Sequence, residues 1–437
     1  MNITDLNHAL ALGNVEQKGL FPHLDQLENA AYVFDIDFGL KVLPTEPGIL
    51  LIRGARQYGK STWLEQMLKN TIIEFGAGTA FYLNGDMLLE HDRLEAAIEH
   101  LLTGFRHDAP VKRIFIDEIT AIPHWEIALK RMSDQGLLRE VLIITTGSNA
   151  ADIRRGAERL PGRKGKLSRT NYLFTPISYR AFHKACSSIL GKDTLMAYLL
   201  SGGSPIACTE LAKNQVLPEY VIELVRDWVE GEVTRSGRNR QSLNNLLQIL
   251  FRFGGTPVAK AKIARETSMA NNTVAAGYID LLSDLCVVMS SFSWDQDNEL
   301  PILRKPTKLH FSNLLVALTY HPKRLRRIED FNSLDESEQG MWLEWLVSQE
   351  LMRRKAINSD ILFEPQLFWQ TQQHELDFVL ENKMFLEVKR GGCSPLEFSW
   401  FSKQFPHSKL IVVNKNQFET NTVKGVTLEE FLLADYF

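Results

Sequence analysis

Residues 54–61 read GARQYGKS, and they directly follow the short apolar run GILLIR at 48–53. The octapeptide fills every fixed position of G-x-x-x-x-G-K-[S/T], a loop whose backbone amides cradle phosphate groups. The apolar run predicts a buried parallel strand, and STWLEQMLKNTI at 61–72 has helical spacing without Gly or Pro. This order directs backbone N–H groups and the positive end of a helix dipole at a di- or triphosphate. The alternative, a chance match in a glycine-containing loop, is disfavoured by the flanking strand and helix.

The loop defines the expected nucleotide contacts. We expect ATP to be bound by Gly54, Gly59, Lys60, Ser61 and Thr62. Lys60 would reach the β- and γ-phosphates, and the Ser61 hydroxyl would bind Mg²⁺. ATP and Mg²⁺ are therefore the expected cofactors.

Strand patterns alternate with helical patterns from residue 48 to about 180. The later strands are expected at TAFYLNG (79–85), RIFIDEI (113–119) and EVLIITTGS (140–148). Such alternation predicts a parallel sheet covered by helices on both faces.

Polar residues end two of these strands. Asp117 would hold Mg²⁺, usually through water, and Glu118 would polarise the attacking water. A strand that merely ends in acidic residues is the alternative. Ser148 or Asn149 would lie beside the γ-phosphate as a sensor, although Gly-Ser-Asn is equally suited to an ordinary turn.

Composition bounds the remaining possibilities. The 437 residues carry a net charge of −4, with 44% hydrophobic and 23% charged residues, as in ordinary globular proteins. This length predicts about three domains, and the charge confines any nucleic-acid binding to local patches. The four cysteines form no CxxC, which indicates a reducing compartment without a zinc site. No apolar run reaches a membrane-spanning length of about 18 residues, and the N-terminus lacks signal-peptide features. We expect a cytoplasmic protein with no membrane partner.

The middle of the chain has helical patterns. Segments 258–268 and 271–285, with Asn271 or Asn272 as the cap before Thr273, predict a helix-turn-helix, and 287–294 and 307–312 suit the strands of a wing. Segment 271–285 has no Lys or Arg, so it is a weak candidate for phosphate contacts. The basic segments at 154–169 and 323–327 are better candidates, with a solvated surface as the alternative.

The C-terminal stretch HELDFVLENKMFLEVKR (374–390) predicts a hairpin that turns at Asn382. Asp377 then faces Glu387, Glu375 faces Lys389, and all four share one face. Opposed like charges are destabilising unless something neutral or cationic intervenes, and a divalent metal is one solution. Lys389 would then orient water or stabilise charge on a phosphate.

The motifs GARQYGKS, IDEI, TTGSN, LPGR followed by TPISYRAF, and the later GGSP resemble bacterial and archaeal AAA-type P-loop ATPases with a C-terminal domain of unknown function. The resemblance spans about 48–390. It implies that Arg163 is an arginine finger, acting in its own subunit or in a neighbour, and that Ser148 is the sensor. Two departures are the missing Glu in ISYRA at 177–181 and SN at 312–313 in place of Asp-Pro.

The D…ExK arrangement resembles the PD-(D/E)XK nuclease fold. This resemblance implies a third carboxylate from the preceding helix, for which Glu344 is the first choice and Glu350 the weaker one. Mg²⁺ or Mn²⁺ would be held by Glu344, Asp377 and Glu387, with Lys389 as the catalytic lysine. The alternative is a nuclease-like domain without cleavage chemistry.

The predicted fold is α/β, with a P-loop NTPase parallel sheet, a helical and winged-helix middle, and a C-terminal PD-(D/E)XK nuclease-like domain. The expected boundaries are a lead-in at 1–47 with one helix over 23–34, the ATPase domain at 48–180, the lid and winged helix at 181–330, and the nuclease-like domain at 335–437. The expected function is Mg²⁺-dependent ATP hydrolysis coupled to nucleic-acid binding, DNA more than RNA, and to possible phosphodiester cleavage. The alternative is a nucleotide-gated switch or scaffold, and a homo-oligomer is compatible with either.

Overall fold

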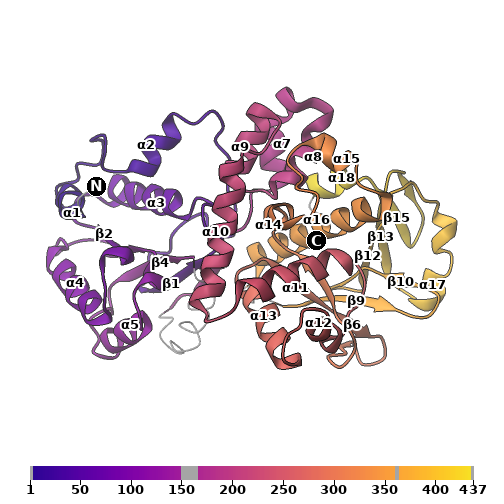
Figure 1. Ribbon diagram of the computed structural model, residues 1–437. Helices are drawn as coiled ribbons and strands as arrows, with labels where there is room; N and C mark the ends of the chain where they lie inside the picture. Colours follow the sequence, from indigo (N-terminus) through magenta and orange to yellow (C-terminus); the bar gives the residue numbers. More distant parts are fainter. Residues whose placement is uncertain (1–2, 149–165, 360–363, 435–437) are drawn as a thin grey trace. The chain divides into compact units, whose positions relative to one another are not determined.

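The computed structural model describes residues 3–148, 166–359 and 364–434, and the chain divides into two compact units (Figure 1). Unit 1 comprises Met1–Thr175 and Lys355–Leu362, and unit 2 comprises Pro176–Arg354 and Phe363–Phe437. The helices of unit 1 are α1 (Ile3–Leu12), α2 (Pro22–Glu28), α3 (Lys60–Phe75), α4 (His91–Gly104) and α5 (Trp125–Asp134). Its strands are β1 (Gly48–Arg53), β2 (Ala80–Asn84), β3 (Arg113–Asp117), β4 (Leu142–Gly147) and β5 (Asn171–Leu173).

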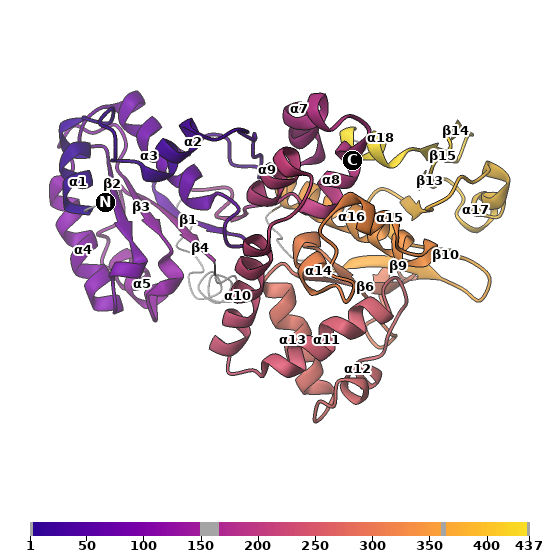
Figure 2. The ribbon, with the colours of Figure 1, turned by 45° about the horizontal axis from the view of Figure 1, so that its top comes forward.

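The five strands of unit 1 form one parallel sheet in the order β2-β3-β4-β1-β5. All residues of β3 and β4 are buried, which explains why these strands read as continuous apolar runs. The sheet lies between α3 on one face and the packed pair α4 and α5 on the other (Figures 1 and 2). The predicted parallel sheet covered on both faces is therefore confirmed.

The lead-in differs from its prediction. Only residues 22–28 form a helix, so the single helix expected over 23–34 is wrong. The buried carboxylate of Glu65 on α3 accepts from the amides of His23 (3.0 Å) and Leu24 (3.2 Å), and so caps the start of α2. Beyond α2 the chain is irregular, and the ring of Phe38 packs 4.7 Å from that of Phe174. Tertiary packing of Phe38 outweighs the local helical spacing.

Unit 2 begins with a run of helices, and its further helices lie between or after its strands. Its helices are α7 (Tyr179–Leu190), α8 (Thr194–Ser201), α9 (Pro205–Asn214), α10 (Glu219–Arg235), α11 (Arg240–Arg252), α12 (Lys260–Glu266), α13 (Asn272–Asp284), α14 (Leu314–Tyr320), α15 (Ile328–Asn332), α16 (Glu336–Asn358), α17 (Phe401–Gln404) and α18 (Leu428–Leu433). The Asn271 side chain accepts from the amide of Val274 at 3.0 Å, so the predicted cap before α13 is confirmed at Asn271. Helices α12 and α13 pack together, as a helix-turn-helix requires.

The strands of unit 2 form two further sheets. They are β6 (Val288–Asp295), β7 (Leu300–Pro301), β8 (Lys308–Phe311), β9 (Gln366–Gln370), β10 (Glu375–Leu376), β11 (Phe378–Leu380), β12 (Met384–Val388), β13 (Lys409–Val413), β14 (Phe418–Glu419) and β15 (Val423–Val426). One sheet has the order β10-β9-β6-β7 with β8 also paired to β6, and the other has the order β11-β12-β13-β15-β14. Because β6 pairs in parallel with β9, the strands expected in a wing share a sheet with the C-terminal region.

The hairpin of β11 and β12 turns where the sequence predicts. Phe378 pairs with Leu386 and Leu380 with Met384, which fixes Asn382 at the centre of the turn. The prediction that Glu375 faces Lys389 is wrong, because Glu375 pairs with Gln370 of β9. The strand breaks at Asp377, whose backbone N–H donates to the side chain of Glu387 at 3.1 Å instead of to the sheet.

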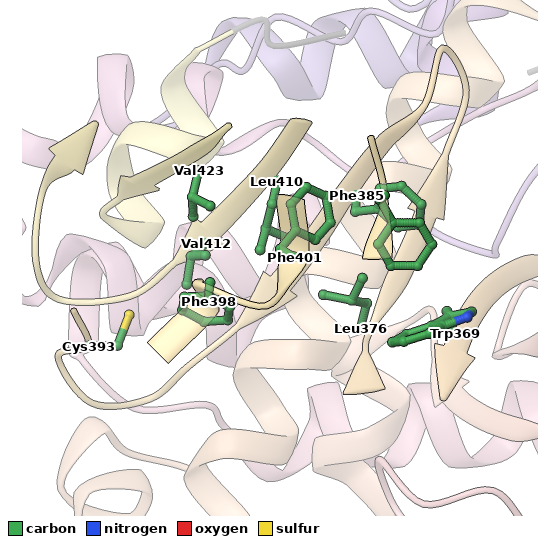
Figure 3. Close-up of a cluster of buried hydrophobic side chains, with 10 residues drawn as sticks. Trp369, Leu376, Phe385, Cys393, Phe398, Phe401, Leu410, Val412 and Val423 are labelled. Carbon is green, nitrogen blue, oxygen red and sulfur yellow. The ribbon is translucent and has the colours of Figure 1, made fainter. Parts of the chain in front are cut away.

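An apolar cluster stabilises the second sheet of unit 2. Aromatic side chains from separate elements meet in it, and the ring centroids of Phe385 and Phe401 lie 5.5 Å apart (Figure 3). The register pairs Phe385 with Leu410 and Glu387 with Val412. The carboxylate of Glu387 therefore lies on the face of β12 that carries Phe385, which explains its burial.

No helix in the described ranges is long and apolar enough to cross a lipid bilayer. All four cysteines are described and buried, and none is in a disulfide.

Candidate functional site

The predicted nucleotide-binding residues gather at one edge of the sheet of unit 1. The loop at 54–61 follows β1, Asp117 ends β3, and Thr146 lies at the end of β4. These strands are neighbours in the order β3-β4-β1, and their carboxyl ends meet at the same edge. Ligands of open parallel sheets bind at this edge, so the predicted residues stand where the chemistry needs them.

The backbone of the loop requires its glycines. Gly59 has φ +99°, in the left-handed region that favours glycine. A Cβ at Gly54 would lie 2.7 Å from the carbonyl oxygen of Phe174, so only glycine fits beside β5. The Lys60 ammonium is 4% exposed and donates to the carbonyls of Gly54 (3.0 Å) and Ala55 (2.9 Å). The loop therefore holds the lysine against its own backbone.

The acidic pair is held by hydroxyls and amides. The Thr146 hydroxyl donates to Asp117, and the Glu118 amide lies 3.2 Å from the Thr146 hydroxyl oxygen. Ser148 donates to Glu118 Oε2 from its amide (3.2 Å) and its hydroxyl (3.0 Å). Arg56 of the loop donates its Nε–H to the Ser148 hydroxyl at 3.3 Å. A continuous chain of contacts thus joins Arg56 of the loop, Ser148 and the carboxylate of Glu118.

Arg56 and Thr146 were missed by sequence reasoning. A charged residue inside the loop and a second hydroxyl in TTGS were the available signals, but neither belongs to the fixed pattern. Thr62 lies in the first turn of α3, beside Ser61. Arg163 and Asn149 lie outside the described residues. The Ser61 hydroxyl and the Asp117 carboxylate are oxygen donors of the kind that Mg²⁺ prefers, so these residues fit the expected ion.

A second carboxylate cluster lies in unit 2. It surrounds the ammonium of Lys308, which is 1% exposed. Lys308 Nζ lies 3.0 Å from Asp377 Oδ1 and 3.3 Å from Glu344 Oε1, and it also forms an ion pair with Glu375. An ammonium group has three N–H donors, and here three carboxylates from different segments surround them.

The other predicted residues complete the cluster. The Val388 amide donates to Asp377 Oδ2 at 2.9 Å, and Lys389 Nζ lies 2.5 Å from Glu387 Oε1. His310 Nε2 lies 3.1 Å from Glu344 Oε1. The structure therefore brings together all four residues predicted for the nuclease-like centre. It adds Lys308 and His310, which the sequence did not indicate, and Glu375, which was expected to face Lys389 and instead contacts Lys308.

Protonation of the cluster follows burial and charge. Burial raises the pKa of Glu387 well above its ordinary value, and the charge of Asp377 adds to the effect. Burial and then Glu344 raise the pKa of Asp377 as well. Burial would also raise the pKa of Glu344, but Lys308 and His310 together outweigh it and lower the pKa to about 2. For Lys308, the three carboxylates outweigh burial, and its pKa is raised.

Glu350, the weaker candidate for the third carboxylate, contacts arginines. Glu350 accepts two hydrogen bonds from Arg353, at 2.7 and 2.8 Å, and one from Arg354 at 2.6 Å. Within the described ranges, no three His, Cys, Asp or Glu side chains are arranged to hold a metal ion. Because Lys308 occupies the cluster, its carboxylates as arranged do not fit the expected Mg²⁺ or Mn²⁺.

Residues 46–183 match the family described as an AAA domain. This region is similar to AAA domains, and it contains the loop at 54–61 together with Asp117 and Glu118. A protein of Methanocaldococcus jannaschii, described as uncharacterized, is 26% identical over 418 residues, which cover 89% of this chain and 85% of the relative.

Two solved structures each match more than two thirds of the chain. A Walker-type ATPase of Pyrococcus abyssi matches with a TM-score of 0.44 and 11% identity over 70% of this chain and 96% of its own. The ORC1 protein of Aeropyrum pernix, solved in complex with DNA, matches with a TM-score of 0.32 and 14% identity over 72% of this chain and 91% of its own. Both TM-scores lie below 0.5, so no functional inference is carried from either structure to this chain.

Proposed function

We propose that the protein is a Mg²⁺-dependent ATP hydrolase whose unit 2 binds nucleic acid, DNA in preference to RNA. The hydrolase proposal rests on the sheet edge at which Lys60, Asp117 and Glu118 meet. Mg²⁺, when bound by Ser61 and Asp117, would neutralise charge on the phosphates.

The residues of the chain have separate roles in this proposal. Lys60 would exchange its two neutral carbonyl partners for phosphate oxygens, which are charged and stronger acceptors. Glu118 would orient and polarise the attacking water, and Ser148 sets the position of its carboxylate. Arg56 donates a hydrogen bond to Ser148, and its guanidinium would stabilise negative charge developing on the γ-phosphate.

The test is phosphate release from ATP with Mg²⁺ or with a chelator. Lys60→Ala is expected to lower the rate by about 10²–10³-fold, as the loss of one charge-stabilising donor does. Lys69→Ala is the matched control, because this lysine lies on the same helix and pairs with Glu16 at the surface. Equal rates for the two variants would overturn the proposal.

Nucleic-acid binding is proposed for the helix-turn-helix of α12 and α13, interpreted as a winged helix with β6 and β8. Lys260 and Arg265 of α12 are exposed and are suited to phosphate contacts. The exposed start of α13 offers Asn272 and Thr273 to base edges, whereas the Asn271 oxygen is used by the cap. The segment at 323–327 is a weaker candidate, because Arg326 pairs with Glu219.

Fluorescence anisotropy with labelled single- and double-stranded DNA and with RNA tests this part. A Lys260→Glu, Arg265→Glu variant is expected to bind weaker and to lose salt dependence, since each phosphate contact releases counterions. Lys403→Glu, on α17, is the control. Unchanged binding in the double variant would place the interface elsewhere.

Arg163 is proposed to stabilise the transition state in its own subunit or in a neighbouring one. Mixing Arg163→Ala with Lys60→Ala protein separates the two cases. Partial recovery of hydrolysis in the mixture is expected for action in a homo-oligomer, and no recovery is expected for action within one subunit.

For the nuclease-like part we favour the alternative, a binding module without cleavage. The observation that favours it is Lys308, whose ammonium lies among the carboxylates that would hold the metal. Incubation of DNA and RNA substrates with Mg²⁺ or Mn²⁺, with and without ATP, is expected to give no cleavage. Cleavage that is lost in Asp377→Ala but kept in Lys60→Ala would establish the nuclease instead.

A further inference from the structure

The carboxylates of unit 2 already have a cation. Glu344 comes from helix α16, whereas Glu375 and Asp377 come from β10 and the residue that follows it, and the Lys308 ammonium contacts all three. Lys308 is presented by β8, whose backbone is fixed by pairing with β6 at Ser291. The backbone position of Lys308 is therefore fixed by strand pairing.

Because the cluster is buried, the Lys308 ammonium and a divalent ion exclude each other from it. An unpaired ammonium or carboxylate at such a position would lose several kcal/mol of hydration, so each needs the other. A divalent ion among Glu344, Asp377 and Glu387 would meet the Lys308 charge at close range, and repulsion in a poorly hydrated site is strong. The ion and the ammonium therefore compete for one position.

We propose that Lys308 is the resident cation of this cluster and occupies the place that a divalent metal takes in the nuclease-like arrangement. The ammonium joins β8 to α16 and β10 without a metal. Removal of the lysine leaves a latent divalent-cation site built from Glu344, Asp377 and Glu387. This inference concerns unit 2 alone, and it holds whether or not the chain hydrolyses ATP.

Charge and ligand type explain the latent site. Without Lys308, the carboxylates of Glu344 and Asp377 lose the ammonium that contacts them, and Mn²⁺ prefers oxygen ligands of the type that these residues and Glu387 carry. Lys389 already neutralises part of the charge on Glu387. Glu375 is one-third exposed and is not required for the site.

The test measures Mn²⁺ bound to the full chain by equilibrium dialysis, without nucleotide and in an Asp117→Asn background that removes the expected ligand in unit 1. Lys308→Met is expected to gain one bound Mn²⁺ relative to its background, and further exchange of Asp377 for Asn is expected to abolish that gain. Lys305→Met is the control, since Lys305 is exposed and precedes β8. The gain is also expected as a rise in melting temperature on adding Mn²⁺, in Lys308→Met only.

The unaltered cluster provides a second arm that does not depend on the folding of the Lys308 variant. Chains with the native Lys308 are expected to bind the same amount of Mn²⁺ whether position 377 is Asp or Asn. One Mn²⁺ that is bound with Asp377 and lost with Asn would overturn the proposal. A folded Lys308→Met chain that gains no Mn²⁺ would overturn the latent site.

Discussion

The two charged clusters of the molecule use lysine in opposite ways. In unit 1, Lys60 donates to two neutral backbone carbonyls, while the nearby Asp117 and Glu118 are held by hydroxyls and amides. In unit 2, Lys308 contacts three carboxylates directly. Neutral partners are readily exchanged for a charged ligand, whereas a buried ion pair is separated only at a large cost in free energy. The first cluster is suited to binding a phosphate, and the second to holding the chain together.

This difference shows why a carboxylate pattern alone does not identify a metal centre. The sequence places Asp377 opposite Glu387, and the repulsion between them does require a positive or neutral partner. The chain supplies such partners itself. The Lys308 ammonium and the Val388 amide contact Asp377, and the Lys389 ammonium contacts Glu387.

The largest expected effect is a difference in stability between variants of the two lysines, Lys308 and Lys60. Lys308→Met is expected to lower the free energy of unfolding by about 3–5 kcal/mol, because it leaves buried carboxylates uncompensated. Lys60→Met is expected to change the same quantity by less than about 1.5 kcal/mol, since its hydrogen bonds to the carbonyls of Gly54 and Ala55 have neutral acceptors. Urea unfolding followed by circular dichroism measures both. Equal destabilisation would contradict the distinction between the clusters.

Catalysis is expected to show the reverse order. Lys60→Met should reduce ATP hydrolysis by about 10²–10³-fold through loss of charge stabilisation. Lys308→Met, corrected for its folded fraction, should keep the wild-type rate because the cluster of unit 2 takes no part in the reaction. Steady-state phosphate release with saturating Mg²⁺ and ATP decides between them.

A buried histidine extends the comparison to pH. His321 packs against Phe251 and Trp342, and burial lowers its pKa to about 4, with Glu338 opposing this effect and Lys323 adding to it. Because the folded pKa lies below the unfolded value of about 6.5, the neutral form is favoured in the fold. The stability it contributes is complete above pH 6.5 and is lost as pH falls towards 4, with an upper bound of about 3 kcal/mol.

Urea unfolding between pH 7.5 and pH 4 tests this expectation. His321→Gln should flatten the acid-side loss of stability, whereas His407→Gln, at an exposed histidine, should leave its slope unchanged. A slope that is the same in wild type and in His321→Gln would contradict the assignment.

The smallest effect concerns the loop arginine. Arg56→Ala is expected to lower kcat by about tenfold, or roughly 1.4 kcal/mol, with little change in KM, since its contact runs through Ser148 to the reacting region. Arg56→Lys should restore only part of the rate, because a lysine lacks the Nε–H that contacts Ser148. A rise in KM at constant kcat would instead indicate ground-state nucleotide binding.

Prediction from sequence succeeded where the determinants are local. The loop at 54–61 and its flanking strand and helix form a contiguous pattern, and the turn at Asn382 fixes the hairpin register. It failed where distant residues decide. Glu375 leaves the hairpin because Asp377 donates its amide N–H to a side chain. The lead-in is irregular beyond Glu28, where Phe38 packs on α3 and β5.

The lysine of the second cluster had no local signal. Lys308 lies 69 residues before Asp377, in a segment that reads only as a strand, and nothing in its neighbours indicates an ionic partner. The role of Arg163 and the positions of the domain boundaries at 180 and 330 stay predictions.

The most direct test compares the same chemical change in the two clusters. Mg²⁺-dependent phosphate release from ATP is measured for wild type, Glu118→Gln and Glu387→Gln. Loss of a positioned acid–base group lowers a rate by about 10²–10⁴-fold, and this loss is expected for Glu118→Gln alone. Wild-type hydrolysis in Glu118→Gln, or an equal loss in Glu387→Gln after correction for folded protein, would contradict the account.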